Sequence, residues 1–210
     1  MPRTDHIVMP EDHMDQLYTS SNPLVRFVHC QRLDAIVRRL PPGHNRVVLD
    51  AGCGEGHLIQ RMHARFPNYE YHGIDITPLA LEKARTRCPY AQFQNMNLAE
   101  IAYDDETFDV IVCTEVLEHI YEYPAVLSEF KRILKKNGLL IMTFPNETLW
   151  TVSRFFLGRR PIKVPDHVNS FTPAAMRSFV SMKNTYVQHL PFGLSFAFSL
   201  NGLMEFQKEQ

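Results

Sequence analysis

Residues 47–58 read VVLDAGCGEGHL, and this stretch decides which fold we expect. It begins as a short apolar strand that ends in an acid, Asp50, and the glycines that follow occupy positions 52, 54 and 56. A glycine at each of these places lets the backbone turn tightly and lets a bulky ligand lie directly against the main chain. The stretch therefore predicts a strand, a ligand-binding loop and a helix, in that order.

The order of strand and helix recurs along the chain. We expect a helix at about residues 23–40, further strands at 71–76, 91–97, 108–113 and 139–144, and helices between them. One of these helices, at about 124–135, is expected to end at Asn137-Gly138. Such alternation is typical of α/β proteins. Residues 185–206 are expected to add one or two antiparallel strands. The fold class is therefore α/β, with a Rossmann-like, doubly wound, mostly parallel seven-stranded sheet and helices on both faces.

Length and composition favour one compact domain. The chain has 210 residues, of which 45% are hydrophobic, enough for one sizeable core. We divide it into an N-terminal lead-in, residues 1–22, and a single domain, residues 23–210, with a cap-like insertion at about 146–172. The 22 basic residues balance the 23 acidic ones, which disfavours nucleic-acid binding. No run of roughly 18 apolar residues or signal-peptide pattern occurs, so we expect a cytoplasmic monomer or homodimer without a transmembrane segment.

The acids around the glycine loop predict the charge of its ligand. In the spacing D-x-G-x-G-x-G, Asp50 stands just ahead of the loop, where a carboxylate suits a cation and repels a pyrophosphate. Asp75 ends the second strand, where its carboxylate can accept both hydroxyls of a ribose. S-adenosylmethionine fits this pattern, because its sulfonium and amino groups are positive. The alternative is an ordinary glycine turn with two surface acids.

Residues 47–58, 73–76, 108–111 and 134–140 together resemble the class I S-adenosylmethionine-dependent methyltransferases. The resemblance covers roughly residues 45 to 145. It implies that the loop lies along the methionine part of the cofactor and that the ends of the next strands hold the ribose and the adenine. The cofactor-binding residues are then Asp50, Gly52, Cys53, Gly54, Asp75, Ile76, Asn97, Leu98 and Thr114.

One of these positions departs from the pattern of the family. Members commonly place an aspartate at the end of the third strand, where it accepts a hydrogen bond from the adenine amino group. This chain has Asn97 there, followed by Leu98. The amide oxygen of Asn97 can still accept, and Leu98 offers its backbone N–H. The departure therefore concerns this one contact and leaves the expected fold unchanged.

A second group of polar residues follows the central strand in CTEVLEHI, residues 113–120. Glu115, Glu118 and His119 stand three and four positions apart, so a helical turn would place them on one face. Two carboxylates and an imidazole so close together would repel unless a divalent cation or several hydrogen bonds satisfied them. His167, in VPDHVNSFT, is the fourth candidate metal ligand. The alternative is the L-E-H sequence common in class I members without metal, in which the histidine packs beside the cofactor.

The pattern E-V-x-E-H, then T-x-P-N, then D-H-x-x-x-F-T resembles two subfamilies. They are the ubiquinone-biosynthesis O-methyltransferases and, more distantly, the methyltransferases of the 3′-terminal 2′-hydroxyl of small RNAs. In both, the resemblance implies Mg²⁺ or Mn²⁺ that clamps two adjacent hydroxyls and lowers the pKa of one. A histidine that is not a ligand would act as general base. The candidate catalytic residues are therefore His119, Glu115 and His167.

The segment after the fifth strand carries the clues to the substrate. Arg154, Arg159, Arg160 and Lys163 form the one dense basic group, which suits an anionic substrate or is simply a solvated loop. Nearby aromatic residues suit a lipidic acceptor, although such residues more often belong to the core. We expect first O-methylation of a phenol or diol in a quinone, lipid or sugar pathway. The alternatives are methylation of RNA 3′ ends and a cofactor-binding partner protein without transfer activity.

Overall fold

The computed structural model describes residues 18–156 and 167–209 and contains a seven-stranded sheet in the order β3-β2-β1-β4-β5-β7-β6. The strands are β1 (Val47–Ala51), β2 (Glu70–Asp75), β3 (Gln92–Asn95), β4 (Phe108–Thr114), β5 (Leu134–Pro145), β6 (Lys183–Leu190) and β7 (Asn201–Gln207). The helices are α2 (Pro23–Arg39), α3 (His57–Arg65), α4 (Pro78–Arg87), α5 (Tyr123–Ile133), α6 (Glu147–Phe156) and α7 (Pro173–Phe179), with 3₁₀ turns η1 (Leu117–His119) and η2 (Phe196–Phe198). The expected Rossmann-like α/β fold is confirmed.

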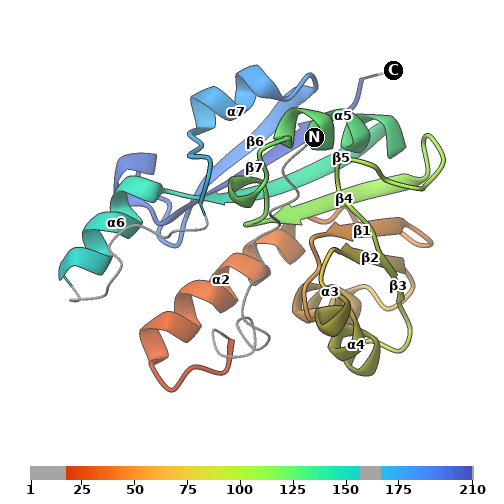
Figure 1. Ribbon diagram of the computed structural model, residues 1–210, viewed down its shortest axis with the longest axis horizontal. Coiled ribbons are helices and arrows are strands. Elements are labelled where there is room, and N and C mark those ends of the chain that lie inside the picture. Colours follow the sequence, from red (N-terminus) through yellow and green to blue (C-terminus); the bar gives the residue numbers. More distant parts are fainter. Residues whose placement is uncertain (1–17, 157–166, 210) are drawn as a thin grey trace, which may run out of the picture.

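The direction of the strands gives the sheet one functional edge. Strands β1 to β5 are parallel, whereas β7 runs antiparallel between β5 and β6. The chain passes from β1 outward to β3 and then returns to β4 on the other side of β1 (Figure 1). Ligands of doubly wound sheets bind at the carboxyl ends of the strands beside such a switch point. The ends of β1, β2, β4 and β5 therefore form the edge at which we look for a site.

Two apolar layers hold the helices against the sheet. On one face α2, α3 and α4 pack against side chains such as Val48 and Val110, and on the other α5 and α7 pack against Leu49 and Ile111 (Figure 1). Neighbouring residues of one strand thus enter different cores, because successive side chains point to opposite faces. This explains why β4 is apolar except for Asp109 and Thr114, since strands covered on both faces are largely apolar.

The boundary between α5 and β5 differs from the expected one. The helix ends at Ile133, and β5 begins at Leu134, which pairs with Phe108. Asn137 has a left-handed φ of 60°, but instead of capping the helix it lies in an irregular part of the strand. Its N–H donates to the carbonyl of Lys208 at 2.9 Å, so the segment is bonded to the end of β7. Pairing with distant strands therefore overrides the local Asn-Gly stop.

Several expectations fall outside the described residues. Most of the lead-in, residues 1–17, and the middle of the cap-like insertion, residues 157–166 with Arg159, Arg160 and Lys163, are not described. Within the described ranges, the helices lack the combination of length and apolarity that crossing a bilayer would require.

Candidate active site

The glycine loop after β1 has the strained geometry that only glycine adopts readily. Gly52, Gly54 and Gly56 have φ values of +78°, +49° and +80°, all in the left-handed region. A Cβ on Gly52 would lie 2.5 Å from a methyl carbon of Val116. The N–H groups of Gly52 and Cys53 donate to the carbonyl of Ile74 at 2.8 and 3.0 Å, which holds the loop against the end of β2. The loop thus presents bare backbone at the sheet edge.

Asp50 is a buried acid with unused hydrogen-bonding capacity. Its side chain is 2% exposed, and Oδ2 has no hydrogen-bond partner among the described residues. Burial, and then the negative charge of Asp75, raise the pKa of Asp50 to about 8. Thr114, at the end of β4, likewise has a buried hydroxyl without a partner in the described part of the chain. Unsatisfied buried polar atoms are costly, so their presence at one edge indicates a polar ligand.

The remaining residues expected to bind the cofactor are distributed along the same edge. Asp75 accepts from the N–H groups of Gly54 and Thr77, each at 2.8 Å. Ile76 follows it and is 41% exposed, so its apolar side chain is available to a ligand. Asn97 Oδ1 accepts from the N–H of Ala99 at 3.0 Å, and this turn takes up one of its two lone pairs. Two further expected residues, Leu98 and Cys53, are buried, and burial raises the pKa of the Cys53 thiol.

Helix α2 brings a buried cation to this edge that the sequence analysis missed. Arg32 is 3% exposed, its Nη1 lies 3.4 Å from Glu115 Oε2, and it donates a hydrogen bond to the hydroxyl of Tyr18. Burial alone would lower the pKa of Arg32, but the carboxylate of Glu115 raises it above its usual value. The Nε atom has no partner among the described residues. The clue in the sequence was an arginine on the helix face otherwise occupied by Leu33 and Ile36.

The expected helical turn that joins Glu115 to Glu118 and His119 is wrong. Only Leu117–His119 form a 3₁₀ turn, and Glu115 precedes it with a left-handed φ of 53°. Its carboxylate turns instead to the strands, where it accepts from Thr143 Oγ1 at 3.0 Å and from Asn201 Nδ2 at 2.8 Å. Burial raises the pKa of Glu115, while the charge of Arg32 counteracts the shift. Glu115 therefore bonds α2, β5 and β7 together.

Glu118, His119 and His167 do come together as expected. Ligand atoms of the three residues lie within 4.8 Å of one another, and the two imidazole ring centres are 4.7 Å apart. Glu118 is 1% exposed, and neither of its carboxylate oxygens has a partner in the described part of the chain. Burial, and then the charge of Glu115, raise the pKa of Glu118 well above its usual value. The group therefore brings three side chains that can bind metal around a buried carboxylate with no partner among the described residues.

Residues on either side of His167 explain how it reaches this place. The N–H groups of Val168 and Asn169 donate to the carbonyl of Glu118 at 2.8 and 3.0 Å. The Asn169 amide also donates to the carbonyl of Ile120 at 2.7 Å. Glu147, the first residue of α6, accepts from His167 Nδ1 at 2.5 Å. Sequence reasoning missed Glu147 and Asn169, because only the fold brings them to the histidine.

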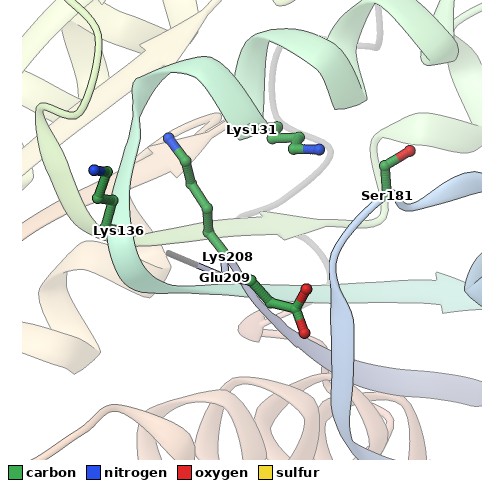
Figure 2. Close-up of a pocket in the computed structure, with 5 residues that line it drawn as sticks. All are labelled: Lys131, Lys136, Ser181, Lys208 and Glu209. Atoms are coloured by element: carbon green, nitrogen blue, oxygen red, sulfur yellow. The ribbon is translucent and has the colours of Figure 1, made fainter.

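A surface cavity at the opposite edge of the sheet is distinct from this site. It has a volume of about 310 Å³ and is lined by Lys131, Lys136, Ser181, Lys208 and Glu209 (Figure 2). These residues come from the end of α5, the start of β5, the α7–β6 connection and the end of β7. Lys208 donates to the carbonyl of Leu134 at 2.6 Å, so this ammonium stabilises the chain itself. The cavity lies at the amino end of the parallel strand β5.

The fold and this edge of the sheet define a class of protein. A parallel sheet with an acid, a left-handed glycine loop and a second acid at its carboxyl edge is the architecture of class I S-adenosylmethionine-dependent methyltransferases. The model of the family described as "Methyltransferase domain" matches residues 43–189. The chain belongs to this methyltransferase family.

Individual relatives agree with this assignment. A probable S-adenosylmethionine-dependent methyltransferase of Mycobacterium tuberculosis is 33% identical over 128 residues, which are 59% of this chain and 45% of that protein. The chain thus spans under half the length of that relative. A ubiquinone biosynthesis O-methyltransferase of Actinobacillus pleuropneumoniae is 29% identical over 76% of this chain and 74% of its own. A crystal structure from Pyrococcus horikoshii matches 96% of this chain and all of its own, with a TM-score of 0.76 at 17% identity, which supports the fold.

Proposed function

We propose that this chain transfers a methyl group from S-adenosylmethionine to a hydroxyl oxygen of a small molecule, assisted by a divalent cation. One observation carries the proposal: in the part of the chain that the structure describes, buried polar atoms without partners gather in two places at the carboxyl edge of the sheet. Asp50 and Arg32 provide the first set, and Glu118 the second. Each set suits one half of a methyl-transfer reaction.

The first set suits the methyl donor. The buried carboxylate of Asp50 favours a cation, and the amino and sulfonium groups of S-adenosylmethionine are cationic. The unpaired Nε of Arg32 offers a donor to the carboxylate at the same end of the cofactor. Asp75 keeps a free lone pair on each oxygen for the ribose hydroxyls, and Ile76 offers an apolar surface to the adenine. The carboxylate of Asp50 and the guanidinium of Arg32 thus complement the opposite charges on the methionine part of the cofactor.

The second set suits a hydroxyl acceptor held by a metal ion. Glu118, His119 and His167 would hold the ion, which when bound supplies the Lewis acidity that lowers the pKa of the acceptor hydroxyl. Glu147 accepts from Nδ1 of His167 and so directs Nε2 toward the group. Glu115 is not a member of this group, because its carboxylate turns toward Thr143 and Asn201.

The donor types also discriminate between metals. Magnesium prefers six oxygen ligands, whereas imidazole suits transition metals. With two histidines and one carboxylate, the group should bind Mn²⁺ more tightly than Mg²⁺. If the ion is absent, His119 or His167 is the group placed to take the proton from the acceptor.

Calorimetric titration tests the metal site directly. We expect Mn²⁺ to bind the wild-type chain and His119→Ala and His167→Ala to bind it at least tenfold more weakly. Glu147→Gln keeps a hydrogen-bond acceptor for His167, so its affinity for Mn²⁺ should lie between those of the wild type and the histidine variants. Unchanged Mn²⁺ binding in both histidine variants would rule out the proposed ligand set.

A radiolabelled methyl-transfer screen tests the activity and the acceptor class. We expect transfer to catechols or to a lipid extract rather than to short RNA, because the 22 basic and 23 acidic residues leave no net positive field for a polyanion. The ubiquinone biosynthesis relative, which covers most of both chains, supports a small acceptor. Cofactor binding with no transfer to any of the three would instead favour a partner protein.

A further inference from the structure

Five apolar side chains stand exposed on two segments that meet at the active edge. The segments are the first turns of α2 and the β6–β7 connection, residues 191–200. The residues, called here the apolar patch, are Leu24 (65% exposed), Phe27 (41%), Phe192 (68%), Leu194 (53%) and Phe198 (71%). The rings of Phe27 and Phe192 stack with their centres 6.2 Å apart, so the two segments adjoin. Contiguous exposed apolar groups mark a binding surface, whereas single ones do not.

The β6–β7 connection projects from the molecule. Gly193 has a left-handed φ of +71°, and its N–H donates to the carbonyl of His189 at 2.8 Å, which closes a tight turn. A Cβ added at Gly193 would meet no atom within 4 Å. The turn therefore leaves Phe192 and Leu194 exposed on either side of Gly193.

The charges around the patch identify what it fits. Residues 184–204 contain no Asp, Glu, Lys or Arg. Between Tyr18 and Leu33 the only charged residues are Arg26, which is exposed, and Arg32, which is buried in the site. A protein interface usually has a polar and charged rim. Aromatic side chains beside a cation, with no carboxylate among them, instead match the surface of an anionic lipid bilayer.

The connection that carries three residues of the patch is hydrogen-bonded to the candidate active site. At the base of the connection, Asn146 donates to the carbonyl of Phe196 at 2.6 Å, and Asn201 donates to Glu115 at 2.8 Å. Glu147, the next residue after Asn146, holds His167. The connection emerges at the end of the sheet from which α6 extends (Figure 1). The base of the connection is therefore anchored at the end of the sheet that carries the candidate active site.

We propose that the apolar patch docks this chain onto an anionic lipid bilayer, so that the active site takes its methyl acceptor from the membrane interface. The docking stands on the patch alone, whereas the origin of the acceptor rests on the proposed function. Insertion of Phe192 and Leu194 supplies apolar burial, and Arg26 supplies attraction to anionic headgroups.

Sedimentation with lipid vesicles tests the docking. We expect the full chain to bind vesicles of phosphatidylcholine and phosphatidylglycerol and to bind pure phosphatidylcholine more weakly. The double variant Phe192→Ser, Leu194→Ser should bind about tenfold more weakly or worse, because two apolar side chains no longer insert. Arg26→Gln should lose only the preference for the anionic vesicles. Tyr90→Ser, which changes a side chain 42% exposed in the turn between α4 and β3, is the matched control and should bind as the wild type does.

Three results would overturn the docking. The first is that the wild-type chain binds neither kind of vesicle. The second is that the double variant binds vesicles as tightly as the wild type does. The third is that the double variant loses self-association while its vesicle binding is unchanged, which would assign the patch to a second copy of the chain. Binding of S-adenosylhomocysteine, measured for each variant, verifies that the site is intact. If vesicle binding holds while no acceptor is methylated, the docking survives and the proposed function fails.

Discussion

The free energy of unfolding of Asp50→Asn as a function of pH tests the charge argument at the glycine loop. Burial and the charge of Asp75 raise the pKa of Asp50 from 3.8 to about 8. The unfolded chain loses this proton near pH 4, whereas the folded chain keeps it until about pH 8. Between these pH values the folded state binds one more proton than the unfolded state, so this group makes the wild-type chain less stable as the pH rises.

The size of the effect follows from the shift. One proton of difference corresponds to about 1.4 kcal/mol per pH unit. Relative to Asp50→Asn, which has the same shape and does not titrate, the wild type should lose about 4 kcal/mol between pH 4 and pH 7. The difference should stop growing above about pH 8, where the folded carboxyl ionises as well.

Urea denaturation of both proteins at each pH from 4 to 9 measures this difference. Cofactor binding supplies an independent readout, because a cation binds the ionised carboxylate. The affinity of the wild type for S-adenosylmethionine should rise by about tenfold per pH unit up to about pH 8, and that of the variant should be lower and flat. A stability difference that is the same at every pH, or a variant that binds the cofactor as tightly as the wild type, would refute the reasoning.

Four other changes test the remaining parts of the structure. Gly52→Ala should abolish cofactor binding and cost about 1–3 kcal/mol of stability, because φ is +78° and the new Cβ meets Val116 at 2.5 Å. Calorimetry measures the cofactor binding, and urea denaturation measures the stability. Glu118→Gln should lose Mn²⁺ binding. Because burial raises the pKa of this acid, the variant should also be more stable than the wild type at pH 8, and this difference should be absent below pH 4. Asn169→Ala should weaken Mn²⁺ binding and leave cofactor affinity unchanged, since its amide bonds only the turn that positions His167; equal losses of both would contradict this. Phe130→Ala, in the core under α5, should lower the free energy of unfolding by about 3–5 kcal/mol, measured by urea denaturation, and the folded variant should keep its affinity for Mn²⁺.

The fold was accessible from the sequence because its determinants are local. The spacing of Gly52, Gly54 and Gly56 behind a short apolar strand requires left-handed backbone at each position, and the structure has it. Residues 108–113 are predicted as a strand of a sheet with helices on both faces, and β4 enters both cores. The boundary between α5 and β5 could not be read in this way, because bonds to β7, more than sixty residues away, hold Asn137 in the strand.

The candidate site was accessible only in part. Glu118, His119 and His167 were identified by their chemical types, and the structure places them together. The expected placement of Glu115 on one helical turn with Glu118 was wrong, because its neighbours in space are Arg32, Thr143 and Asn201 from three distant elements. No pattern within CTEVLEHI reports those partners. A buried arginine on the apolar face of a helix was the one sequence clue to this network.

The sequence by itself determined the order of strands and helices, the conformation of the cofactor loop and the kinds of groups at the sheet edge. These depend on backbone sterics and on side-chain alternation over a few residues. Only the tertiary structure decided which carboxylates find partners and which stay unpaired, and that the aromatic residues of α2 and of the β6–β7 connection form one exposed patch. Burial and hydrogen bonding depend on atoms contributed by strands and helices far apart in the chain, so they become fixed only when the whole sheet is assembled.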